Sequence, residues 1–272
     1  MLTRPIHQSN GDVSKACIDR SKKLISSGRN IKLTIAYDGT NYHGWQIQPS
    51  QPTIQAKIND ALTKIIGHPV SVIGAGRTDK GVHATGQVAN FVSHTNMSTD
   101  IIQRAINANL SDDIVISEVS EVEDSFHARF SATRRCYRYT ILNRPYPCPF
   151  QRKNTFFISR HICLEQAEMI CQTLVGRNNY AAFQKKGSER LNPVCNVFEA
   201  NLTRTDDLVI FTIQADAFLR GMVRAIIGTI LKILQHQNAA KEMERIIANR
   251  NRSLAGTSAP AKGLTLTAVK YG

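Results

Sequence analysis

Residues 74–91 read GAGRTDKGVHATGQVANF, a glycine-rich loop that leads into an apolar, strand-like run. A dinucleotide-binding G-x-G-x-x-G loop would need glycine at position 79, which is Asp79 here. A P-loop would need Lys followed by Ser or Thr after Gly81, and Val82 and His83 stand there instead. The glycines allow the backbone to approach other groups closely. We therefore interpret the segment as a loop that presents charged side chains and does not cradle a triphosphate.

Asp79 is the candidate reactive group of this loop. Arg77 and Lys80 flank it, and their positive charges favour the ionised form of its carboxyl group. An ionised carboxylate in a basic protein suits attack on an electrophilic carbon or removal of a proton. On the pattern alone, a solvent-exposed turn with an ion pair is an equally good interpretation.

Strands and helices alternate on both sides of the loop. Apolar residues at every second position predict a strand from residue 31 to 37, and Thr53 and Ser98 are positioned to cap two amphipathic helices. A long buried helix is predicted from 218 to 233 and a closing strand from 264 to 271. This order predicts an α+β fold of two lobes that share one cleft. We divide the chain into a basic tail over 1–29, predicted to be disordered, a lobe over 30–133 with the Asp79 loop, and a lobe over 134–272.

The charge of the chain points to a polyanionic partner. Lys and Arg number 34 against 21 Asp and Glu, a formal net charge of +13 over 272 residues. The six cysteines form no C-x-x-C pair and fit no zinc-binding spacing. With no secretory signal and no apolar run of membrane-spanning length, we expect reduced thiols in a cytoplasmic protein without membrane association.

Five stretches, in order along the chain, resemble the tRNA pseudouridine synthase A family. They are IAYDGTNYHGWQIQP at 35–49, the loop at 74–91, FHARFSATRRCYRYTILN at 126–143, ADAFLRGMVRAIIGTIL at 215–231 and APAKGLTLTAVKY at 259–271. The resemblance covers roughly residues 31–271 and excludes only the tail. It implies two ferredoxin-like (RRM-like) lobes that form a continuous mixed β-sheet, with helices packed on one side and the active site in a central cleft.

The resemblance also implies roles for individual residues. The family's catalytic aspartate corresponds to Asp79, its neighbouring active-site arginine to Arg77 and its stacking tyrosine to Tyr137. The apolar floor of the pocket corresponds to Leu266. The implied enzyme is a homodimeric isomerase that modifies uridines at positions 38–40 of the tRNA anticodon stem-loop.

Two positions depart from the family pattern. Arg220-Gly221 stands where many members have a His-His pair, and Lys80 stands where many have Ala or Gly. Neither departure affects Asp79, so the implied reaction is unchanged, and we expect differences only in the RNA contacts.

Pseudouridine formation breaks the N1–C1′ bond, turns the uracil and rejoins it through C5. Nothing is oxidised and no group is added, so we expect neither cofactor nor metal. The base must be flipped out at a cost of a few kcal/mol, and stacking on Tyr137 recovers about 1–3 kcal/mol. Asp79 has three routes open to it: attack on C1′, attack on C6, or removal of the C2′ proton.

Arginines are the candidate RNA contacts. Arg220 and Arg224 are four residues apart in the predicted helix and would share one face. Arg129 and Arg134, together with Arg135 and Arg138, interleave with aromatic residues, which suits phosphate contact plus stacking. Two other functions compete with this one: an RNA-binding module without activity, which the intact set of Arg77, Asp79 and Tyr137 argues against, and a hydrolase. The hydrolase is disfavoured because the motifs contain neither a second carboxylate nor an acidic cluster.

Overall fold

The computed structural model describes residues 28–185, 187 and 192–272. The predicted tail therefore lies outside the described residues, except for residues 28 and 29. The strands are β1 (Arg29–Tyr37), β2 (Ile73–Gly74), β3 (His83–Ser93), β4 (Ile114–Val122), β5 (Ala132–Asn143), β6 (Phe156–Ile158), β7 (Gly176–Asn179), β8 (Val194–Thr205), β9 (Leu208–Ala215) and β10 (Leu264–Tyr271). The α-helices are α1 (Ile54–Ile66), α2 (Thr99–Asn107), α3 (Leu164–Gln172), α4 (Met222–Ile233) and α5 (Ala239–Asn249).

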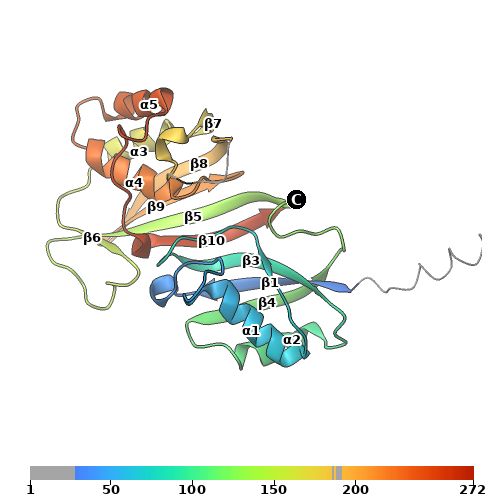
Figure 1. Cartoon of the computed structure of the whole chain (residues 1–272). Coiled ribbons are helices and arrows are strands. Elements are labelled where there is room, and N and C mark those ends of the chain that lie inside the picture. The colour runs from blue at the N-terminus through green and yellow to red at the C-terminus, as the bar shows by residue number, and fades with distance from the viewer. Residues whose placement is uncertain (1–27, 186, 188–191) are drawn as a thin grey trace, which may run out of the picture.

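All the described strands belong to one mixed sheet (Figure 1). Its order is β4-β1-β3-β10-β5-β9-β8-β7, with β2 paired to β3 and β6 paired to β5. The β10–β3 and β5–β6 pairs are parallel, and the other pairs are antiparallel. The last strand of the chain therefore lies in the middle of the sheet and joins the two halves.

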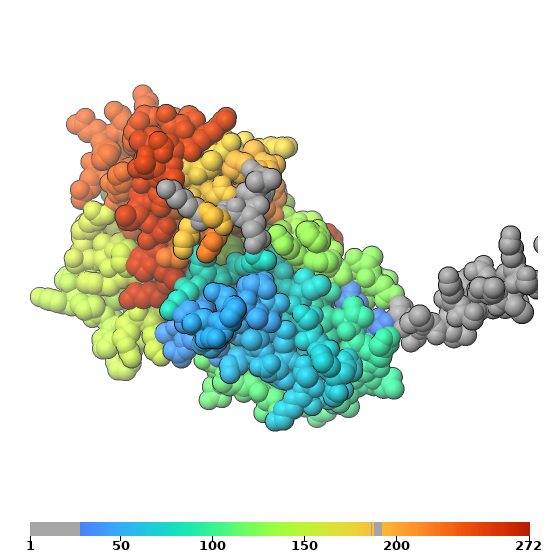
Figure 2. Space-filling model, in the orientation of Figure 1, coloured from blue at the N-terminus to red at the C-terminus, as the bar shows by residue number. Residues whose placement is uncertain are grey.

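The helices form two groups on the same face of the sheet. Helices α1 and α2 bury their apolar sides on β1, β3 and β4, whereas α3, α4 and α5 pack on β5, β8 and β9. Leu264 packs in the hydrophobic core under α3, α4 and α5, and Leu266 packs in the core under α1 and α2. Alternate residues of a strand point to the same face, so both helix groups cover the same side of β10. The space-filling view shows the two halves as adjoining bodies (Figure 2). The predicted α+β fold with a continuous mixed sheet is confirmed. The lobe boundary at residues 133 and 134 falls just inside β5 and stays a prediction.

Local signals explain where the first two helices begin. The hydroxyl of Thr53 accepts a hydrogen bond from Ala56 N (3.4 Å), and Ser98 accepts one from Ile101 N (3.4 Å). Both predicted caps are therefore confirmed. No helix in the part of the chain that the structure describes is long and apolar enough to cross a membrane.

Two boundaries differ from the predictions. Strand β1 begins at Arg29, because its backbone already pairs with Ser93 of β3. The Arg29 guanidinium also pairs with Glu121 (2.8 Å) and donates to the carbonyls of Thr95 and Met97 (3.0 and 2.7 Å). Helix α4 begins at Met222 and not at residue 218. The reason is Gly221, whose φ of 71° is left-handed and interrupts the helical backbone.

Helix α4 crosses the segment 256–259 at a point where there is no room for a side chain. A Cβ atom on Gly228 would lie 1.7 Å from the carbonyl oxygen of Thr257. Helix propensity alone would favour alanine there by about 1 kcal/mol. We expect Gly228→Ala nevertheless to lower the free energy of unfolding by roughly 1–3 kcal/mol, because overpacking outweighs propensity.

Denaturant unfolding would measure this change, with Gly76→Ala as the control. A Cβ on Gly76 would meet nothing within 4 Å, so its effect should stay within about 0.5 kcal/mol. A stabilised Gly228→Ala protein would contradict the close crossing.

Candidate active site

The Asp79 loop is held by the segment that follows β1. Trp45 N donates to the carbonyl of Thr78 (3.1 Å), and the hydroxyls of Tyr37 and Thr78 share a hydrogen bond of 2.9 Å. Gly44, with φ 94°, lies so close that a Cβ on it would be 2.4 Å from Thr78 O. The stretch at 35–49 therefore supports the loop directly, which accounts for the presence of both motifs in one chain.

Asp79 forms an ion pair with an arginine from the other half of the chain. Nη1 of Arg224, in the first turn of α4, lies 3.1 Å from Oδ2 of Asp79. The exposed fractions of the two side chains are 21% for Arg224 and 24% for Asp79, so solvent reaches the pair only partly. Arg224 is itself fixed, because its Nε donates to Ala259 O (2.8 Å) and its carbonyl accepts from Ala259 N (2.9 Å). The carboxylate is thus held at the junction between the halves.

Tyr137 and Leu266 lie side by side on the strands next to the loop. They are register partners on β5 and β10, and Leu266 also pairs with Ala84 of β3. Leu266 is fully buried, and the Tyr137 ring meets the edge of Phe218 at a centroid distance of 5.0 Å. Burial, and secondly the negative charge of Asp79, raise the pKa of Tyr137 to about 12. Its phenol is therefore neutral at physiological pH and lies within the field of the Asp79 carboxylate.

The two predicted neighbours of Asp79 occupy different surroundings. Arg77 is exposed on the loop, and Nζ of Lys80 lies 2.9 Å from Nε2 of His43. The sequence-based interpretation assigned charge compensation of Asp79 to the flanking Arg77 and Lys80. The structure adds Arg224, which lies 145 positions away in the chain.

His83 anchors the far end of the loop. Its Nδ1 accepts from Gly39 N (3.1 Å), and its Nε2 lies 3.2 Å from the carbonyl oxygens of both Lys153 and Lys262. The side chain is buried and joins three segments that are distant in sequence. This histidine has a structural position.

Arg135 also differs from its expected role. It belonged to the group of arginines interpreted as RNA contacts, but its guanidinium donates to four backbone carbonyls. These are Ala132 (3.0 Å), Asp216 (2.8 Å), Ala75 (3.2 Å) and Arg129 (2.5 Å). Arg135 therefore ties the start of the Asp79 loop to the rest of the sheet. Nothing in its local sequence distinguishes it from Arg134 or Arg138.

The remaining predicted RNA contacts are exposed and lie on separate elements. The guanidinium of Arg134 stacks over Phe198 (4.3 Å to the ring centroid), and that of Arg129 lies 5.5 Å from the centroid of Phe130. Arg220 precedes α4, so it does not share a helix face with Arg224, and that prediction is wrong. Arg129, Arg134, Arg138, Arg220 and Arg224 stay predicted RNA contacts.

The described residues contain no cluster of three or more His, Cys, Asp or Glu side chains arranged to hold a metal ion. The arrangement at the junction of the halves is one carboxylate, one paired arginine and one neutral tyrosine above an apolar floor. Such a set can orient a planar ring and act on it with the carboxylate.

Comparison with known families shows the family to which the chain belongs. The family model described as tRNA pseudouridine synthase matches residues 33–131 and 170–272. The chain therefore belongs to the tRNA pseudouridine synthase family, a family of isomerases.

Individual relatives carry a narrower name. A tRNA pseudouridine synthase A of Acetivibrio thermocellus is 42% identical over 243 residues, covering 89% of this chain and 100% of that protein. A protein of the same name from Thermoanaerobacter sp. is 38% identical with the same coverage, and tRNA pseudouridine synthase A 2 of Clostridium perfringens is 37% identical with the same coverage. Among solved structures, a chain of a Cbf5-Nop10-Gar1 complex aligns over 86% of this chain and 57% of its own, at a TM-score of 0.34 and 11% identity. A structural likeness of that size supports no conclusion about function.

Proposed function

We propose that this protein converts uridine to pseudouridine at positions 38–40 of the tRNA anticodon stem-loop, with Asp79 as the catalytic carboxylate. The observation that carries this proposal is the contact of Asp79 with Arg224, 3.1 Å apart, at the junction where the half-buried Tyr137 pairs with the buried Leu266. The family gives the reaction class, and this contact supplies a carboxylate suited to it.

Each side chain has a distinct part in the proposed reaction. The target uridine leaves its stack, and the ring of Tyr137 offers a face on which the flipped base can stack. Asp79 acts on the sugar or the ring while Arg224 compensates its charge and holds its orientation. The N1–C1′ bond breaks, C5 bonds to C1′, the hydrogen of C5 leaves as a proton and N1 gains one. Leu266 closes the floor, so the detached uracil stays in place. The three routes for Asp79 all use this geometry.

The RNA is expected to approach over positively charged side chains. Arg77 lies on the catalytic loop itself, and Arg129, Arg134 and Arg220 are exposed on other elements. We propose that Arg77 contacts the flipped nucleotide and that the other three contact phosphates, which makes tRNA binding salt-dependent.

We further propose a homodimer, as the resemblance implies, and a cytoplasmic location. The five cysteines of the described residues, Cys136, Cys148, Cys163, Cys171 and Cys195, are all free thiols, which fits a reducing compartment.

The test of this function is tritium release from tRNA transcripts labelled at uridine C5, because pseudouridine formation must expel that hydrogen. The wild-type protein should release tritium from a transcript with uridine at position 38, 39 or 40. Transcripts with cytidine at all three positions should release almost none. Release that persists with those cytidines would place the target elsewhere in the RNA, whereas no release from any tRNA would contradict the reaction.

A further inference from the structure

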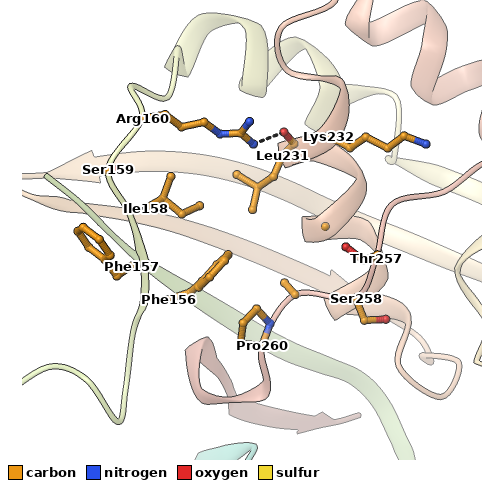
Figure 3. A pocket seen from close by; sticks show the side chains of 12 residues that line it. Phe156, Phe157, Ile158, Ser159, Arg160, Leu231, Lys232, Thr257, Ser258 and Pro260 are labelled. Atoms are coloured by element: carbon orange, nitrogen blue, oxygen red, sulfur yellow. Dashed lines mark hydrogen bonds between the residues drawn. The ribbon is translucent and has the colours of Figure 1, made fainter. Parts of the chain in front are cut away.

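A concavity lies outside the site described above. A pocket of about 500 Å³ opens between β6 and α4 (Figure 3). Phe156 and Ile158 project from β6, and Leu231 of α4 and Pro260 face them (Figure 3). Its walls are thus aromatic and aliphatic, and the hydroxyls of Thr257 and Ser258 line one side.

One wall of this pocket also supports the active site. Ala259 lines the pocket and at the same time holds Arg224 through two hydrogen bonds. Pro260 lines it as well, and its carbonyl accepts from the hydroxyl of Tyr139 (2.8 Å). Ala261, the next residue, packs against Gly81 of the catalytic loop, since a Cβ on Gly81 would lie 3.4 Å from that of Ala261. The segment 259–261 therefore separates the pocket from the Asp79 loop.

The charge of the pocket favours an anionic ligand. None of its twelve lining residues is acidic, and Arg160 supplies a positive charge. The ammonium group of Lys232, the other basic lining residue, donates to the carbonyl of Leu254 (3.1 Å), which does not line the pocket. Nη2 of Arg160 donates to the carbonyl of Leu231 near the end of α4, which fixes the guanidinium (Figure 3). A guanidinium has five N–H donors, so one anchored in this way can still bind a phosphate oxygen.

We propose that this pocket binds an unstacked nucleotide of the RNA substrate, with its base beside Phe156 and its phosphate on Arg160. Single-stranded RNA is recognised by stacking of splayed bases on aromatic rings together with cationic contacts to the backbone. The pocket supplies both, and it adds hydroxyl groups that can meet a base edge or a 2′-OH. The proposal rests on the proposed function. It extends that function by giving the RNA a second anchoring point behind the catalytic loop.

Two variants test the pocket without altering the catalytic residues. Arg160→Gln should raise KM for tRNA about 5–10-fold, leave kcat unchanged, and reduce the slope of log binding constant against log salt by about 0.7. Arg160 also donates to a carbonyl at the end of α4, so Arg160→Gln could alter the helix as well as the pocket. Ser258→Glu therefore provides a second, independent test of RNA binding at the pocket. Ser258 is exposed, and its hydroxyl accepts a hydrogen bond from Nη2 of Arg252 (3.5 Å) and none from α4. A carboxylate there therefore adds negative charge at the pocket without disturbing the helix.

Matched controls carry the same charge changes elsewhere. Arg245→Gln removes a positive charge from α5, and Gln172→Glu adds a negative charge at the end of α3. Both positions are exposed, and neither control should change KM.

The outcomes separate the pocket from the reaction. Filter binding measures the affinity of each variant for the same tRNA, and this measurement does not require tritium release. Failure of the proposed function is therefore distinguished from failure of the pocket proposal. Affinity and salt slope equal to wild type in both Arg160→Gln and Ser258→Glu would overturn the proposal. A fall in molecular mass in solution, with RNA affinity retained, would overturn it as well and would assign the pocket to contacts between copies of the chain.

Discussion

Asp79→Asn is expected to reduce pseudouridine formation by roughly 10²–10⁴-fold or more while tRNA binding persists. The amide is almost isosteric with the carboxylate, so the loop backbone and the surroundings of Tyr137 should keep their shape. It carries no negative charge and is a poor base and nucleophile, so each of the three routes fails at its first step. Tritium release under single-turnover conditions measures the rate, and filter binding measures the affinity.

A matched control separates the loss of one negative charge from the loss of the proposed catalytic group. Asp60→Asn removes the same charge from an exposed position of α1 and should leave both readings unchanged. Tritium release by Asp79→Asn at the wild-type rate would remove Asp79 from its proposed role. Loss of binding together with turnover would instead indicate that the carboxylate mainly holds the loop.

Arg224→Gln is expected to have the second-largest effect. The substitution removes the positive charge that lies 3.1 Å from Asp79 and leaves a partly buried carboxylate without this partner. We expect the single-turnover rate to fall about 10²–10³-fold through lost electrostatic orientation, with a smaller change in tRNA affinity. Arg224→Lys keeps the charge but presents it as a single flexible ammonium group, so partial recovery of the rate is expected.

Arg220→Gln is the appropriate comparison, because Arg220 is exposed ahead of α4 and is proposed to contact phosphate. It should weaken binding and flatten the salt dependence while the rate at saturating tRNA stays near that of wild type. If Arg224→Gln behaved in this same way, Arg224 would be an RNA contact and its pairing with Asp79 would not matter for turnover.

Arg220 and Arg224 show what sequence spacing alone cannot predict. Their spacing of four residues predicted one shared helix face and one shared role. In the structure, the left-handed backbone at Gly221 places Arg220 outside the helix, and α4 directs Arg224 towards Asp79. A glycine is compatible with a helix start and with a helix interior, so the sequence pattern does not choose between the two.

The features that the sequence determined are local or carried by ordered motifs. The Asp79 loop, the caps at Thr53 and Ser98, and the alternation of apolar residues in β1 depend on interactions within a few residues, which a pattern records directly. The order of the five motifs also identified the family and the mixed sheet. Each of these can be read without knowing which segments meet.

The features that required the folded chain all join distant segments. Placement of β10 between β3 and β5 makes Leu266 a neighbour of Tyr137, and the α4 orientation makes Arg224 the partner of Asp79. Arg135 donates hydrogen bonds to four backbone carbonyls that converge on its guanidinium. Its local sequence nevertheless resembles that of the neighbouring arginines. Such contacts depend on the packing of whole elements, where burial and geometry select one partner among many residues of the same chemical type.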